Sequence, residues 1–314
     1  TWRSWAVNTG VHPAITTYLD IRKGDFYHVE ATVDGKTFVT PRGWVDLSDM
    51  LRLYEQLNIK VDEPLVRQYL QHDKTAKQFA IYYDLWLKYR SDYQVDDILA
   101  GKASESIHKR AKAAKFDERI SLLGLLMDAI LQRLRGIYMR YEVASSLKQE
   151  LMNIRRQSVS KKQTIVKVVE SSISAAEKKL KASIAAQLLS RAEEEKQRLM
   201  ISFLQEQVHV LPNDDSTAFA QIKAAYDELV KQLKKSSTAA QKNLENVFSF
   251  AEDAFGEGQE MLILVTELTA SQDAAWFISQ YGCDAYFHHN KELLFYERQV
   301  EVIRKLEELD LTDD

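Results

Sequence analysis

The chain has 314 residues, 45% of them hydrophobic and 28% charged, and its formal net charge is −4 at pH 7. This composition is typical of a soluble globular protein and excludes a disordered or collagen-like chain. The small negative charge gives no broad basic surface, so we expect no nucleic-acid partner. Ten glycines and four prolines are few for this length, which predicts long helices and a mainly α fold.

Cysteine content and hydropathy indicate which covalent links, metal sites and cellular compartment to expect. The single Cys283 excludes an intrachain disulfide and a multi-cysteine zinc site, and it fits a reducing compartment, so we expect a cytoplasmic protein. No run of about eighteen apolar residues occurs, so we expect no transmembrane segment. The chain opens on Thr1 without a signal-peptide pattern, which suggests a fragment or a processed product.

Residues 1–95 form the first predicted domain, because they contain four of the five tryptophans and three of the four prolines. Two segments, 29–33 and 36–40, alternate like β-strands around Asp34-Gly35, a pair typical of a two-residue hairpin turn. Elsewhere in this domain apolar residues recur at helical spacing after capping residues. We therefore expect one hairpin and several helices, over about 13–24, 41–57, 62–72 and 73–91.

The hairpin segment Asp34-Gly35-Lys36-Thr37 also matches the Gly-Lys-Thr end of a phosphate-binding loop. Such a loop needs an earlier glycine, and Glu30 stands at that position. It also needs a helix after the loop, whereas here the lysine opens a second strand. We therefore interpret the segment as a hairpin, and no other part of the sequence fits a nucleotide cradle.

The start of the helix over 41–57 carries two unfavourable residues. Thr40 is typical of an N-cap and Pro41 of a first helical residue, but Arg42 and Gly43 follow in the first turn. A cation there opposes the helix dipole at a cost of about 0.3–1 kcal/mol, and a glycine costs roughly 1 kcal/mol against alanine. A phosphate bound by Arg42, with Gly43 allowing close approach, would offset both costs. A solvated arginine and a packing glycine explain the same residues without a ligand.

A second domain is predicted after a connection. Segment 96–116 is rich in lysine and serine and shows little periodicity, which predicts a linker. Residues 117–314 are expected to form a long antiparallel helical bundle or a coiled-coil-like arm. The fold class is therefore mainly α: a small helical domain with one β-hairpin, then a long-helix extension.

Three helices are expected at the start of this extension. Apolar residues alternate at steps of four and three from Phe116 to Ile154, which predicts one long helix. A second amphipathic helix is expected from Ile165 to Phe203. The polar segment 210–216 breaks the pattern before a third helix restarts.

Neither a metal site nor a catalytic nucleophile is evident. His288 and Glu292 lie four residues apart near Asp284 and His289, but adjacent histidines point in different directions and a third ligand is lacking. We therefore expect no metal. A glycine-rich elbow and a paired histidine are absent from the sequence around Ser171, Ser172 and Ser174. The chain alone is expected to be non-enzymatic.

Four stretches carry a family resemblance that covers about residues 5–95: Val11–Ile15, Phe26-Tyr27, Phe38–Ser48 and Tyr82–Asp84. Together these stretches resemble the C-terminal end of a MoxR-family AAA+ ATPase. In that family the matched part is the helical lid, which follows the nucleotide-binding core. The phosphate loop, acidic strand and arginine finger of that core have no counterpart in this sequence, and the roughly 200 residues after the lid are not explained by the resemblance.

The resemblance implies a role for the first turn at residue 42. Arg42 would be the second sensor, reaching the γ-phosphate from across the cleft, and Gly43 would belong to the same nucleotide-binding turn. ATP and Mg²⁺ are expected only together with the core domain, and no cofactor is expected for this chain alone. The chain alone is expected to be inactive.

The resemblance also implies partners: the chain's own AAA+ core, a homo-oligomeric ring, and a protein with a von Willebrand factor A domain. The helical extension would serve as a docking or assembly arm in chaperone-like remodelling. An alternative is a non-enzymatic helical scaffold or interaction protein whose lid-like region is a relic or a docking module.

Overall fold

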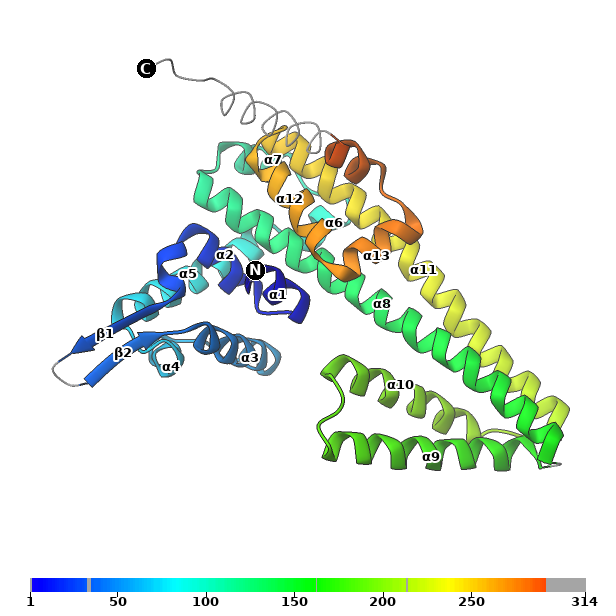
Figure 1. The fold of residues 1–314 in the computed structure, drawn as a ribbon. Helices are drawn as coiled ribbons and strands as arrows, with labels where there is room; N and C mark the ends of the chain where they lie inside the picture. The colour runs from blue at the N-terminus through cyan, green and yellow to red at the C-terminus, as the bar shows by residue number, and fades with distance from the viewer. Residues whose placement is uncertain (1, 33–34, 162, 213, 292–314) are drawn as a thin grey trace, which may run out of the picture. The chain divides into compact units, whose positions relative to one another are not determined.

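A computed structural model describes residues 2–32, 35–161, 163–212 and 214–291. The described residues are mainly α-helical, and their two strands pair in a single antiparallel hairpin (Figure 1). The predicted fold class is therefore confirmed. Within the described residues, no helix combines the length and the apolar character needed to cross a bilayer.

The first hundred residues fold as short helices around the hairpin. The elements are α1 (Trp2–Thr9), α2 (Pro13–Ile21), a 3-10 helix (Lys23–Phe26), β1 (His28–Thr32), β2 (Gly35–Val39), α3 (Pro41–Leu57), α4 (Glu63–Tyr69) and α5 (Asp73–Asp92). The four predicted helices correspond to α2, α3, α4 and α5. The side chain of the residue before each of α2, α3, α4 and α5 accepts a free amide of that helix, and the cap predicted at Thr40 is among them.

The hairpin forms where expected, but its second strand begins one residue earlier than predicted. Thr32 pairs with Gly35, so Gly35 belongs to β2. The prediction that Gly35 is a turn residue is wrong, and Asp34 lies outside the described residues. The lysine-containing segment is a strand, so the helix that a phosphate-binding loop requires does not follow it.

The expected linker over 96–116 contains two helices, α6 (Val95–Leu99) and α7 (Glu105–Ala113). The Ser104 side chain caps α7 by accepting the Ile107 amide. The Leu99 carbonyl accepts hydrogen bonds from the side-chain amides of Asn243 (2.7 Å) and Asn246 (2.8 Å). The segment is thus ordered by contacts with residues far along the chain, which local sequence patterns do not report.

The rest of the chain consists of longer helices. They are α8 (Phe116–Lys161), α9 (Ile165–Ala185), α10 (Arg191–Val208), α11 (Asp215–Phe255), α12 (Gln259–Ala270) and α13 (Gln272–Tyr281). The long first helix is confirmed as α8, and the break before the third helix is confirmed between α10 and α11. The single helix expected from 165 to 203 is wrong: the chain turns after Ala185, and Gln187 takes the left-handed conformation at φ 53°.

Contacts group the chain into two compact units, Thr1–Gln132 with Gln241–Asp314, and Arg133–Ala240. This grouping does not coincide with the expected divisions at residues 95 and 116. The first unit has an aromatic core whose fully buried members include Trp44, Phe79, Tyr83, Trp86, Tyr93, Phe248 and Phe277.

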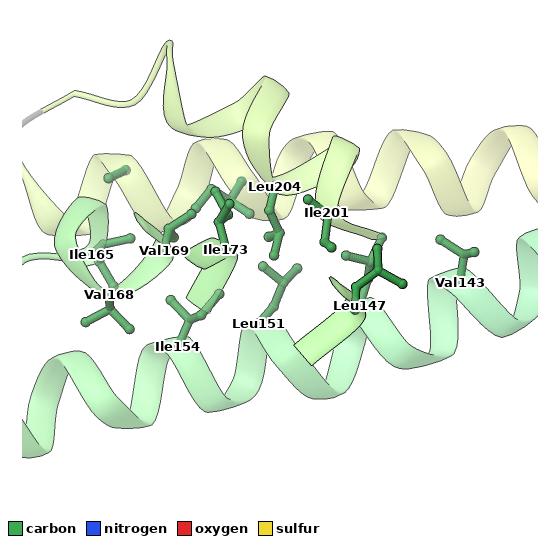
Figure 2. Close-up of a cluster of buried hydrophobic side chains, with 13 residues drawn as sticks. Val143, Leu147, Leu151, Ile154, Ile165, Val168, Val169, Ile173, Ile201 and Leu204 are labelled. Atoms are coloured by element: carbon green, nitrogen blue, oxygen red, sulfur yellow. The ribbon is translucent and has the colours of Figure 1, made fainter. Parts of the chain in front are cut away.

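The second unit has an aliphatic core, which Figure 2 shows between α8, α9 and α10. Its buried members come from four helices: Val143, Leu147, Leu151, Ile154, Ile165, Val168, Val169, Ile173, Leu180, Ile201, Leu204, Ala218 and Ile222. Their recurrence at helical spacing is what the heptad-like pattern of the sequence predicted.

Candidate functional site

The first turn of α3 is built as its sequence predicted. The Thr40 hydroxyl accepts a hydrogen bond from the Gly43 amide at 3.1 Å, and Pro41 occupies the first helical position. No acidic residue lies in this turn. The remaining free amides and the positive end of the helix dipole therefore create a local preference for an anion.

Gly43 is required by packing. A Cβ atom at this position would lie 2.5 Å from the carbonyl oxygen of Tyr69, the last residue of α4. Real Cβ atoms do not approach a backbone oxygen this closely. The glycine therefore lets the first turn of α3 approach the end of α4, and its presence needs no ligand.

Arg42 has a different environment from its neighbour. Its side chain is 90% exposed, and its Nε atom lies 3.7 Å from Asp46 Oδ2, one turn along the helix. A surface pair of this kind contributes little and holds the guanidinium loosely. The guanidinium is thus accessible to an anionic group brought by another surface.

The opposite face of α3 is fixed by the aromatic core. Trp44 is fully buried, with its ring 5.3 Å from Phe79 in an edge-on contact and 5.8 Å from Tyr18. Leu47 and Leu51 continue this buried face. The packing holds the helix start in one orientation while Arg42 projects outward.

A buried polar network anchors the second half of α3. Glu55 Oε1 lies 3.1 Å from His12 Nε2 and accepts a hydrogen bond from the Tyr83 hydroxyl at 3.0 Å. Burial opposes the charged carboxylate, but the hydrogen bonds from His12 and Tyr83 outweigh it and lower the pKa of Glu55. The Ser48 hydroxyl accepts the His12 amide at 2.8 Å, and Arg52 donates to the Gly10 carbonyl at 2.7 Å. This network holds α3 through residues that lie beyond its first turn.

The structure also brings together a group that sequence reasoning missed. His28 and Glu30 of β1 lie beside His72, the N-cap of α5, with one ligand atom of each within 4.8 Å of the other two. His28 and Glu30 are two residues apart on a strand and therefore share a face. The sequence alone shows that His28 and Glu30 share a strand face. His72 is 42 positions beyond Glu30, and only the fold shows that it lies beside them.

Of the adjacent histidines His288 and His289, which we expected not to bind metal, His289 packs and pairs within the fold. His289 is buried, its Nε2 atom lies 2.7 Å from Glu252 Oε1, and its ring stacks on Phe248. Its Nδ1 atom lies 3.1 Å from Glu257 Oε2, although without hydrogen-bond geometry. Glu292, the other half of the helical spacing, lies outside the described residues.

The second unit contains a pocket of about 550 Å³. Polar residues from α8, α9 and α10 line it, including Glu150, Ser171, Ser172, Lys179 and Lys196, together with apolar Met200 and Leu204. Among the described residues that line the pocket there is no histidine to act as a general base for the serines. The pocket therefore offers binding surface without an evident nucleophile.

Comparisons with protein-family models, with curated proteins and with solved structures found no match to this chain.

Proposed function

We propose that this chain is the lid and helical extension of a MoxR-type AAA+ ATPase, and that Arg42 acts as its second sensor in ATP hydrolysis. The observation that carries the proposal is the first turn of α3. An exposed arginine stands there, at the positive end of a helix whose other face is locked into an aromatic core. The Arg42 side chain is accessible, and the helix that carries it is held in place by packing. A residue that reaches a phosphate on a neighbouring domain needs both properties.

The chemistry of the proposed role is electrostatic. During phosphoryl transfer negative charge develops on the γ-phosphate oxygens and the leaving group, and a guanidinium can donate two hydrogen bonds to such oxygens. The helix dipole adds a smaller contribution of the same sign. A cation brought to these oxygens by the lid stabilises the transition state because it lies where the negative charge develops.

Partners and cofactors follow from the same proposal. ATP and Mg²⁺ would bind mainly to an AAA+ core joined to this chain, in a homo-oligomeric ring acting in the cytoplasm. The helices from α8 onward would provide surfaces for assembly or for docking a partner, such as a protein with a von Willebrand factor A domain. The pocket in the second unit, lined by charged and apolar side chains, supports a docking role for this extension.

The proposal is tested by ATP turnover in the natural full-length polypeptide. Arg42→Ala should lower kcat at least about tenfold, because a charge-stabilising donor is lost. Lys74→Ala is the matched control, since Lys74 is also an exposed cation at the second position of a helix, α5. Turnover that is unchanged in Arg42→Ala, or equally reduced in both variants, would contradict the sensor role.

The alternative is a non-enzymatic helical scaffold, and one observation favours it. Packing against Tyr69 accounts fully for Gly43, and an exposed arginine paired loosely with Asp46 is common on solvated helices. The coding sequence upstream of Thr1 separates the two functions. A phosphate loop and an acidic strand there support the ATPase, and their absence would leave the scaffold.

A further inference from the structure

The group formed by His28, Glu30 and His72 has the composition of a transition-metal site. Two imidazoles and one carboxylate form the protein ligand set of several zinc and iron sites, where the remaining coordination positions stay open. His28 Nε2 lies 3.4 Å from Glu30 Oε2, and His72 Nε2 lies 3.9 Å from the same oxygen. The two imidazole rings are 4.3 Å apart between centroids and tilted by 44°.

These distances suit a shared cation. Around a tetrahedral Zn²⁺ with bonds of about 2.0–2.1 Å, neighbouring ligand atoms lie about 3.3 Å apart. The His28–Glu30 distance already has nearly this value, and the His72–Glu30 distance exceeds it by little more than half an ångström. Small side-chain rotations close that difference, because His28 and Glu30 are partly exposed on the strand.

A neighbouring residue orients one of the ligands. His72 Nδ1 lies 2.8 Å from the hydroxyl oxygen of Thr75, which is itself buried. Nδ1 also accepts the Thr75 amide in the cap, but only at 3.4 Å. Metal binding at Nε2 exchanges this long contact for an Nδ1 proton donated to the Thr75 hydroxyl, and the Nε2 lone pair then faces Glu30 and His28. Histidine ligands in proteins are commonly held by such a hydrogen bond from the other ring nitrogen, which fixes the tautomer.

The backbone near the group is also held in place. The Phe38 amide of β2 donates to the Gln71 carbonyl at 3.2 Å, immediately before His72 in the chain. This hydrogen bond already joins β2 to the segment just before α5. A metal ion held by His28, Glu30 and His72 would join β1 to the same end of α5.

We propose that His28, Glu30 and His72 bind one divalent transition-metal ion through two imidazole Nε2 atoms and the carboxylate. The ion clamps the β-hairpin to the N-terminus of α5, and water or a ligand from a partner completes its coordination. The site is independent of Arg42 and of any role in ATP hydrolysis.

The first test is titration of the chain, prepared without a histidine tag, with Zn²⁺ by calorimetry at pH 7.5. We expect one zinc ion per chain. His28→Ala and Glu30→Gln should each weaken affinity by about 100-fold or more, since losing a ligand costs at least as much as losing an orienting partner. Thr75→Val should weaken it about 10- to 100-fold while keeping the three ligands.

Two further variants separate binding from folding. His72→Asn removes the imidazole but keeps a side chain that can cap α5, so it should lose the metal and retain the wild-type helical circular dichroism. His209→Ala removes an exposed histidine at the end of α10 and should leave zinc affinity unchanged. Zinc binding that survives in His28→Ala and His72→Asn would overturn the proposal, as would a wild-type chain that binds none.

A spectroscopic measurement on the wild-type chain does not depend on any variant. Co²⁺ added in place of Zn²⁺ should give visible absorption bands of a four- or five-coordinate nitrogen and oxygen site, removed by a chelator. A thiolate charge-transfer band would place the ion at Cys283 instead and contradict the assignment.

Discussion

Arg42 and Gly43 are adjacent in the first turn of α3, yet different forces act on them. Gly43 is constrained by the backbone of α4, because the Tyr69 carbonyl leaves no space for a side chain. Arg42 is exposed to solvent and stands at the positive end of the helix dipole, and its Nε atom lies 3.7 Å from Asp46 Oδ2. Packing thus explains why a glycine stands at residue 43. Among the described residues no packing contact requires an arginine at residue 42, so its position in the first helical turn calls for a functional explanation.

The explanation of Gly43 makes a prediction about stability. Gly43→Ala should lower the free energy of unfolding by about 1–3 kcal/mol, since the new Cβ must displace backbone. In most helical positions the same change raises stability by about 0.5–1 kcal/mol. Gly136 in α8 provides that case, because a Cβ there would meet no atom within 4 Å.

Urea unfolding of both variants measures the contrast. We expect the two substitutions to change the free energy of unfolding with opposite signs. If Gly43→Ala is as stable as Gly136→Ala, the close approach of α3 and α4 is not a real constraint, and the glycine would again call for a ligand.

At the residue scale, the sequence shows that the first turn of α3 is unusual but reveals only part of the cause. Arg42 and Gly43 stand out because each breaks a local helix rule. The contact that explains Gly43 comes from residue 69, and the histidine that faces His28 and Glu30 comes from residue 72. Neither contact leaves a periodic signal in the sequence.

At the scale of elements, apolar periodicity located most helices, while turn chemistry was less well predicted. The expected helix over 165–203 is broken because Gln187 adopts a left-handed conformation and Ser190 starts a new helix. Ser190 is followed three residues later by Glu193, whose amide its side chain accepts at 3.2 Å. This Ser-x-x-Glu pattern is a capping box and was an available signal for the break.

The buried face of α8 leads to a prediction for the second unit. Leu147 is fully buried in the aliphatic core, whereas Met152 on the same helix is 65% exposed. Leu147→Ala should cost about 2–5 kcal/mol, through lost burial and the cavity left behind. Met152→Ala should change stability by no more than about 0.5 kcal/mol.

Thermal or urea unfolding followed by circular dichroism compares the two variants. Equal effects would mean that the apolar stripe of α8 does not define the core of residues 133–240. The test is specific to helix orientation, since both substitutions shorten a large apolar side chain within five residues of each other.

For the whole molecule, the sequence predicted the mainly α class and not the grouping of its parts. Segment 96–116 looks like a linker because it is polar and short in apolar repeats. In the structure Leu99 accepts hydrogen bonds from Asn243 and Asn246, and Gly101 has a positive φ of 69° beside Asn246. Contacts between residues more than 140 positions apart therefore decide which segments belong together.

The proposed function of the whole protein requires that Arg42 contact the γ-phosphate of a nucleotide held by an adjoining core. Its most direct test compares ATP and ADP affinities of the natural full-length polypeptide with those of Arg42→Ala. A charge-assisted hydrogen bond is worth about 1.5–3 kcal/mol, so ATP binding should weaken about tenfold or more. ADP lacks the γ-phosphate, and its affinity should not change. Equal weakening for both nucleotides, or no weakening for either, would contradict the account.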